Sequence, residues 1–181
     1  MIDRSRQFTF LVQEPGVGQS INYMTKPALA ERLCDLAEIQ PFMRVLEPSA
    51  GTGIIAEIAR GRGATVECVE LNADFANILR KEGFTVFQAD FLNWRAGHLY
   101  DRIVMNPPFV VDGMADLEHI KRAWGWLKYG GKLVSVVNRT LPENPAFIEW
   151  LARRNLVATS DVLPDDAYGL VPTAVVVIHE S

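Results

Sequence analysis

An asparagine followed by two prolines and an aromatic residue, Asn106-Pro107-Pro108-Phe109, has the residue types to act on a flat amine. The Asn106 side-chain oxygen and the Pro107 carbonyl can each accept one N–H of an exocyclic amine and draw its nitrogen toward tetrahedral geometry. Both prolines fix φ, and Pro107 keeps Asn106 out of the α region, so the acceptors are held in place beforehand. Phe109 offers a face on which a base can stack. The alternative is a proline-rich turn whose Phe fills the core.

A glycine turn precedes this tetrapeptide in the sequence. An apolar strand over 44–48 leads into Glu47-Pro48-Ser49-Ala50-Gly51-Thr52-Gly53, and a helix is expected over 53–61. A strand, a glycine turn and a helix in succession form the usual site for a nucleotide-like ligand, because the glycines allow close approach of the backbone. The segment from Gly51 to Ala56 also fits the dinucleotide fingerprint, so NAD stays open for this segment alone. That fingerprint explains neither Glu47 nor the tetrapeptide.

Acidic residues follow the next two predicted strands. Glu70 lies about 20 residues after the glycine turn, where ribose hydroxyls need an acceptor. Asp90 could accept a hydrogen bond from an adenine amino group, and Phe91 could pack beside the ring. For both acids the alternative is helix capping or solvation, the only roles expected of Asp74 and Asp116.

The carboxyl ends of parallel strands share one edge of an open α/β sheet, and ligands bind there. Four predicted site residues occupy such strand ends: Glu47, Glu70, Asp90 and Asn106. The sequence therefore predicts one ligand-binding edge.

Taken together, these motifs resemble those of class I S-adenosylmethionine-dependent methyltransferases, specifically the adenine-N6 amino-methyltransferases with the gamma motif order. The segment from Tyr23 to Pro27 resembles a further cofactor element, which reads aromatic–x–Thr–Pro in the DNA enzymes; here Lys26 stands between Thr25 and Pro27. The resemblance implies catalysis by the tetrapeptide 106–109 and a cofactor site with no metal. The implied cofactor-binding residues are Tyr23, Thr25, Glu47, Pro48, Ser49, Ala50, Gly51, Gly53, Glu70, Leu71, Asp90, Phe91 and Asn106.

The resemblance implies methyl transfer to the N6 amine of adenine in nucleic acid, with DNA favoured over RNA. Three alternatives remain open: an RNA adenine-N6 methyltransferase, a protein-glutamine methyltransferase, and a non-catalytic or nicotinamide-dependent cofactor-binding protein. Little sequence is left for target recognition, so a homodimer mate or a specificity partner is compatible with the chain.

Composition sets the class of protein. About half of the 181 residues are hydrophobic, which suits one domain with a proper core, and no apolar run approaches a membrane span. The net charge is −4, and the basic residues are spread along predicted helices, which favours only modest nucleic-acid binding. Cys34 and Cys68 lie in predicted elements as reduced core residues, and no secretory signal is visible, so we expect a cytoplasmic protein.

Alternating strands and helices predict an α/β fold, Rossmann-like, with a seven-stranded, mainly parallel sheet, a C-terminal antiparallel hairpin and helices on both faces. Residues 1–20 are expected to form a lead segment or active-site cover, and residues 21–181 a single catalytic domain without a separate target-recognition domain. Helices are predicted over 27–39, 53–61, 73–82, 116–129 and 144–154, and strands over 44–48, 65–71, 84–89, 102–105, 132–137, 156–163 and 172–179.

Overall fold

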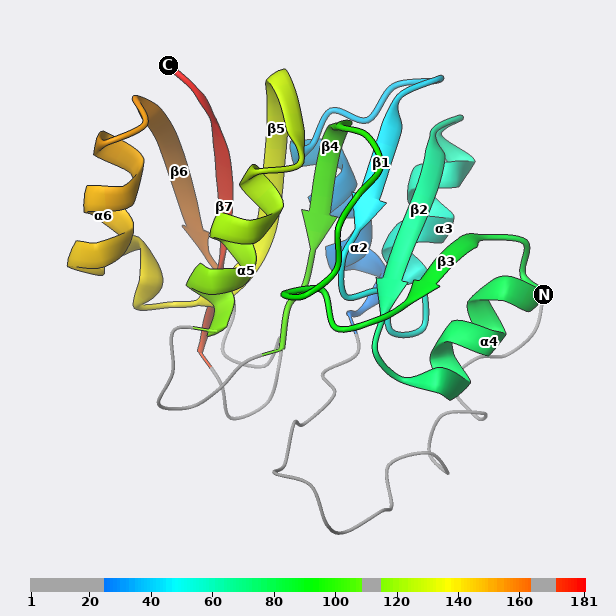
Figure 1. The fold of residues 1–181 in the computed structure, drawn as a ribbon. Helices are drawn as coiled ribbons and strands as arrows, with labels where there is room; N and C mark the ends of the chain where they lie inside the picture. Colours follow the sequence, from blue (N-terminus) through cyan, green and yellow to red (C-terminus); the bar gives the residue numbers. More distant parts are fainter. Residues whose placement is uncertain (1–24, 109–114, 164–171) are drawn as a thin grey trace, which may run out of the picture.

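The computed structural model describes residues 25–108, 115–163 and 172–181. Seven strands form one sheet in the order β3-β2-β1-β4-β5-β7-β6, in which β1 to β5 run parallel and β7 runs antiparallel to both β5 and β6 (Figure 1). The predicted fold class, including the C-terminal hairpin, is confirmed. The strands are β1 (Arg44–Glu47), β2 (Thr65–Glu70), β3 (Thr85–Gln88), β4 (Tyr100–Met105), β5 (Leu127–Asn138), β6 (Leu156–Val162) and β7 (Thr173–Glu180).

Helices cover both faces of the sheet because successive strand residues point to opposite sides. Val45 and Cys68 point into a core beneath α2 (Pro27–Leu36), α3 (Ile54–Gly61) and α4 (Ala73–Lys81). Their chain neighbours Leu46 and Val69 point into a second core beneath α5 (Ala115–Trp124) and α6 (Pro145–Ala152). A short 3-10 helix, η1 (Leu141–Glu143), precedes α6. Both cysteines are fully buried and free, as predicted.

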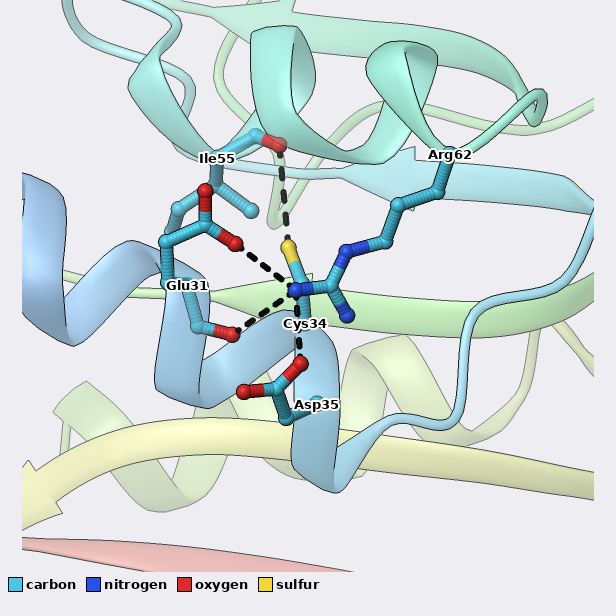
Figure 2. A network of polar contacts seen from close by, with 5 residues as sticks. All are labelled: Glu31, Cys34, Asp35, Ile55 and Arg62. Carbon is cyan, nitrogen blue, oxygen red and sulfur yellow. Dashed lines mark hydrogen bonds and ion pairs between the residues drawn. The ribbon is translucent and has the colours of Figure 1, made fainter.

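Helix α2 is fixed to α3 by a polar network (Figure 2). One guanidinium nitrogen of Arg62, which follows α3, lies 2.7 Å from carboxylate oxygens of both Glu31 and Asp35 on α2. Burial raises the pKa of Cys34 to about 12, so its thiol stays protonated and donates to the Ile55 carbonyl at 3.8 Å. These contacts fix the position of α2 relative to the glycine turn that begins α3.

Three predicted element boundaries were wrong by three residues or more. Helix α2 ends at Leu36 rather than at Ile39, and Glu38 has a positive φ of 52° that a helix cannot continue through. The predicted helix 116–129 ends at Trp124, and β5 begins at Leu127 rather than at Lys132.

Gly130 and Gly131 lie inside β5, where the pairing with β4 changes register. Gly130 has a φ of 71°, and a Cβ on Gly131 would lie 2.8 Å from the Lys128 carbonyl oxygen. Glycine is therefore required to build this irregularity within the strand. In the described part of the chain, no helix is long and apolar enough to cross a membrane.

Candidate active site

The glycine turn between β1 and α3 uses its two glycines differently. Gly51 and Gly53 both have positive φ, 51° and 79°. A Cβ on Gly53 would lie 2.3 Å from Leu79 of α4, so this glycine allows the turn to pack against a helix. A Cβ on Gly51 would meet nothing within 4 Å. Gly51 is thus the point at which a ligand can approach the backbone of the turn closely.

Glu47 supports the glycine turn from inside the protein. Its side chain is only 2% exposed, and one carboxylate oxygen accepts the Ala56 N–H at 2.8 Å, which links the end of β1 to the first turn of α3. Burial raises the pKa of this carboxyl well above its usual range; the Ala56 hydrogen bond opposes that rise, and the charge on Glu70 adds to it. Glu47 lies at the predicted edge, in a position that shapes the turn.

Glu70 is brought directly against the glycine turn. One of its carboxylate oxygens accepts the Gly51 N–H at 2.6 Å, and the other accepts the Asn72 N–H at 2.7 Å. Leu71, the next residue, is 70% exposed. The turn and the acid that the sequence predicted to share a ligand are therefore neighbours, with an open apolar side chain beside them.

The remaining residues of the turn are packed to different degrees. The Ala50 N–H donates to the Val69 carbonyl at 3.1 Å, which fixes the start of the turn to β2. Pro48 and Ala50 are buried, whereas Ser49 is half-buried. Of these three predicted cofactor residues, Ser49 therefore has the most accessible side chain.

Asp90 and Phe91 differ in exposure. Asp90 is exposed, and its carboxylate oxygens accept from the Leu92 N–H at 2.9 Å and from the Asn93 side-chain amide at 2.6 Å. Phe91 is only 3% exposed, and its ring stacks on His119 with centroids 5.8 Å apart. Asp90 remains available at the edge, but the buried ring of Phe91 does not support the predicted packing against a ligand.

Asn106 follows the last residue of β4 and is half-buried. Its side-chain amide nitrogen donates to the Thr25 hydroxyl oxygen at 3.0 Å, so two predicted site residues that are 81 positions apart are in direct contact. Pro107 is buried, and Pro108 is exposed. Two further predicted site residues, Tyr23 and Phe109, lie outside the described residues.

Asp116 has a larger role than the helix cap predicted for it. The side chain is 5% exposed; one oxygen accepts the Leu117 N–H and the other accepts the Asn138 N–H, both at 2.9 Å. This acid therefore connects the start of α5 to the carboxyl end of β5, beside the strand that carries Asn106. The pairing of Met105 with Ser135 brings these strand ends together, and no local sequence signal reveals that.

The fold and this edge agree with a sequence comparison. The profile of the methyltransferase small domain family matches residues 29–162. The chain belongs to this family.

Similar proteins include enzymes that act on RNA. The tRNA1(Val) (adenine(37)-N6)-methyltransferase of Aliivibrio fischeri is 32% identical over 87 residues, which cover 42% of this chain and 37% of the relative. The structure of TrmN from Thermus thermophilus matches with a TM-score of 0.67 and 25% identity, over 86% of this chain and 49% of that protein. This methyltransferase domain therefore spans about half of TrmN and little more than a third of the curated relative.

A third similarity concerns the fold alone. Precorrin-6y C5,15-methyltransferase from Geobacter metallireducens GS-15 matches with a TM-score of 0.66 at 16% identity, over 90% of this chain and 93% of that protein. The shared architecture thus extends to a protein named for a different methylation, and substrate choice depends on the site.

The cofactor of this class I methyltransferase is S-adenosylmethionine, and the edge suits it. S-adenosylmethionine carries a cationic sulfonium, a cationic ammonium and ribose hydroxyls. Among the described residues, the acids at this edge accept hydrogen bonds from backbone N–H groups or a side-chain amide and form no ion pair with Lys or Arg. Within the described residues, the exposed or half-buried carboxylates of Glu70 and Asp90 thus have no Lys or Arg partner, whereas burial disfavours the charged form of Glu47. Such a site favours a cationic ligand with hydroxyl donors.

Proposed function

We propose that this protein transfers a methyl group from S-adenosylmethionine to the exocyclic N6 amine of adenine in RNA. The observation that carries the proposal is the position of Asn106, which stands at the carboxyl end of β4, is followed by two prolines and is bonded to Thr25. The similarity to a tRNA adenine-N6 methyltransferase supports RNA as the substrate class. DNA, the substrate favoured by the sequence motifs, has no such support, so RNA replaces DNA as the leading hypothesis for the substrate.

The residues at this edge would act by positioning and by electrostatics. Bound S-adenosylmethionine supplies an electrophilic methyl group, and its positive charge disperses during the displacement. The Asn106 side-chain oxygen and the Pro107 carbonyl accept the two N–H groups of the adenine amine, which frees the nitrogen lone pair for attack. The amine becomes acidic as it is methylated, so water can take the proton and no separate general base is needed.

Cofactor recognition would depend on the glycine turn and on the two acids nearest to it. Glu70, already beside Gly51, would accept hydrogen bonds from the ribose hydroxyls. Asp90 would accept one from the adenine amine of the cofactor. Tyr23 remains a candidate for the methionine end, and Phe109 remains the candidate for stacking on the target base.

Target recognition by this chain would be limited. We propose that residues 21–181 act as one catalytic domain with little surface reserved for reading sequence. With a net charge of −4, binding to RNA should be modest and should fall steeply with added salt, because phosphate contacts release counterions. A homodimer mate or a separate partner would then supply specificity.

The proposal is tested by incubating the pure protein with methyl-labelled S-adenosylmethionine and separate pools of tRNA, other RNA, DNA and protein. We expect label in tRNA, mapped to adenine N6, and transfer that is slower by about 10²–10³-fold in Asn106→Ala. Label only in DNA adenine would restore the DNA reading, and label only on glutamine would make the protein a protein methyltransferase. Binding of NAD in place of S-adenosylmethionine would refute the cofactor assignment as well.

A further inference from the structure

Thr25 is placed at the active edge by the start of α2. Pro27 is the first residue of the helix, and Lys26 before it is extended, with φ −67° and ψ 146°. A residue that precedes proline is restricted to extended conformations, so the chain must leave the helix in this direction. The start of α2 therefore determines where the Thr25 side chain lies.

Helix α2, which places Thr25, is held against the rest of the protein by buried side chains and polar contacts. Ala30, Leu33 and Cys34 are fully buried, and Arg62 binds two acids of the helix (Figure 2). At its far end, the Arg102 side chain of β4 donates to the Ala37 carbonyl at 2.6 Å. One strand, β4, is thus bonded to α2 through Arg102 and followed at its other end by Asn106, which contacts Thr25.

The contact with Thr25 selects an orientation for the Asn106 amide. The amide is planar, so when its nitrogen donates to the Thr25 hydroxyl, its oxygen is directed to the opposite side of the group. An amide turned by 180° about its terminal bond would present N–H donors where the reaction needs an acceptor. We propose that Thr25 is a positioning residue that holds the Asn106 oxygen toward the substrate amine.

This inference rests on the proposed function, and it differs from the cofactor-binding role that the sequence resemblance gives to Thr25. A cofactor contact would act on the affinity for S-adenosylmethionine. A positioning contact acts on turnover after the cofactor and substrate are bound. The two roles are separated by measuring cofactor affinity and kcat on the same variants.

The experiment compares Thr25→Val, which keeps the shape of the side chain without the hydroxyl, with Thr25→Ser, which keeps the hydroxyl. We expect Thr25→Val to lower kcat on the order of 10²-fold, since displacement of a reacting group by about 1 Å has that effect. The Kd for S-adenosylmethionine should stay near that of the wild type, and Thr25→Ser should recover most of the turnover. Thr159→Val, an exposed threonine on β6, is the matched control and should leave all of these values unchanged.

Weaker cofactor binding with unchanged kcat at saturating cofactor would overturn the inference, as would equal losses in the valine and serine variants. A double-mutant cycle of Thr25→Ser or Thr25→Val with Asn106→Ala, followed by thermal unfolding, tests the contact without a substrate. We expect the losses of stability in Thr25→Val and Asn106→Ala to be non-additive in the double variant.

If the wild type methylates no nucleic acid, the proposed function fails, while the cycle still shows whether Thr25 and Asn106 interact. If it methylates RNA and Thr25→Val is fully active, only this inference fails.

Discussion

Acidic side chains lie at both edges of the sheet, but their partners differ. At the amino edge, where the parallel strands begin, Asp101 lies 2.8 Å from Lys128, and Glu38 lies 2.8 Å from Lys132. Burial opposes ionisation of Asp101, but Lys128 and a backbone hydrogen bond outweigh it and lower the pKa of the carboxyl. At the carboxyl edge the acids accept mainly from backbone N–H groups instead. Among the described residues, Asp101 and Glu38 at the amino edge are therefore offset by lysines, whereas Glu70 and Asp90 at the carboxyl edge have no Lys or Arg partner.

The amino edge also contains a pocket lined by polar side chains. It has a volume of about 280 Å³ and is lined by Arg44, Thr65, Glu67, His98 and Tyr100. The Tyr100 hydroxyl donates to Glu67 at 2.6 Å, and the His98 Nε2 lies 3.4 Å from the same carboxylate oxygen. Because Tyr100 and Glu67 hydrogen-bond to each other, we interpret this pair as structural. The following variants test the contrast between the two edges.

The largest expected effect is the loss of turnover in Asn106→Ala. Removing a preorganised group that acts on developing charge lowers the rate by about 10²–10³-fold, or roughly 2.7–4 kcal/mol, by analogy with oxyanion-hole donors. Affinity for S-adenosylmethionine, measured by calorimetry, should change little. Asn106→Asp should be milder, because a carboxylate can still accept the amine N–H. A fully active alanine variant would remove Asn106 from the chemistry.

Two glutamates of β2, Glu70 and Glu67, allow the contribution of each edge to cofactor affinity to be compared. Glu70→Ala should weaken the binding of S-adenosylmethionine by about 1.5–3 kcal/mol through loss of charge-assisted hydrogen bonds. Glu67→Ala removes the same type of side chain from the amino half of the same strand and should leave the cofactor Kd unchanged. Titration calorimetry on both variants is the measurement. Equal losses of affinity would show that the two edges are not functionally distinct.

Tyr100→Phe should reduce stability without affecting the cofactor. Tyr100 is fully buried, and burial together with its hydrogen bond to Glu67 raises the pKa of the phenol far above its usual range. Removing the hydroxyl leaves a partly buried carboxylate short of a donor, at a cost of about 1–2 kcal/mol. Chemical denaturation should report this loss while the Kd for S-adenosylmethionine stays constant. A large change in that Kd would connect the amino-edge pocket to function.

The smallest expected effect is a change in the pH dependence of stability in Glu47→Gln. Burial raises the pKa of Glu47 in the folded state above its unfolded value, so its contribution to stability is present below the unfolded pKa and is lost as pH rises through the folded pKa. Glutamine can still accept the Ala56 N–H and does not titrate. The Tm of the variant should therefore exceed that of the wild type increasingly as pH rises, by about 2–4 °C for each 1 kcal/mol. Parallel Tm curves against pH would show that Glu47 carries no such shift.

The sequence by itself determined the order of the elements and the edge of the sheet at which the predicted site residues lie. Short apolar strands that alternate with helices predict a parallel sheet. The parallel strands end at the same edge, so the sequence places Glu47, Glu70, Asp90 and Asn106 together. Most helix and strand bounds could be predicted to within two residues from the apolar pattern and the turn residues. The place of Gly130 and Gly131 inside β5 could not be predicted. Gly131 is required there because the Lys128 carbonyl oxygen lies too close for a Cβ atom, and that contact exists only in the folded strand.

Only the tertiary structure decided what each edge residue contacts. Periodicity gives the face on which a side chain lies, but not its partner across the fold. It therefore could not show that the Phe91 ring is buried against His119 or that Asp116 bonds to the end of β5. Nor could it pair Thr25 with Asn106, because that contact depends on how α2 packs against the sheet. Such contacts between residues distant in the chain are set by packing, which no local pattern encodes.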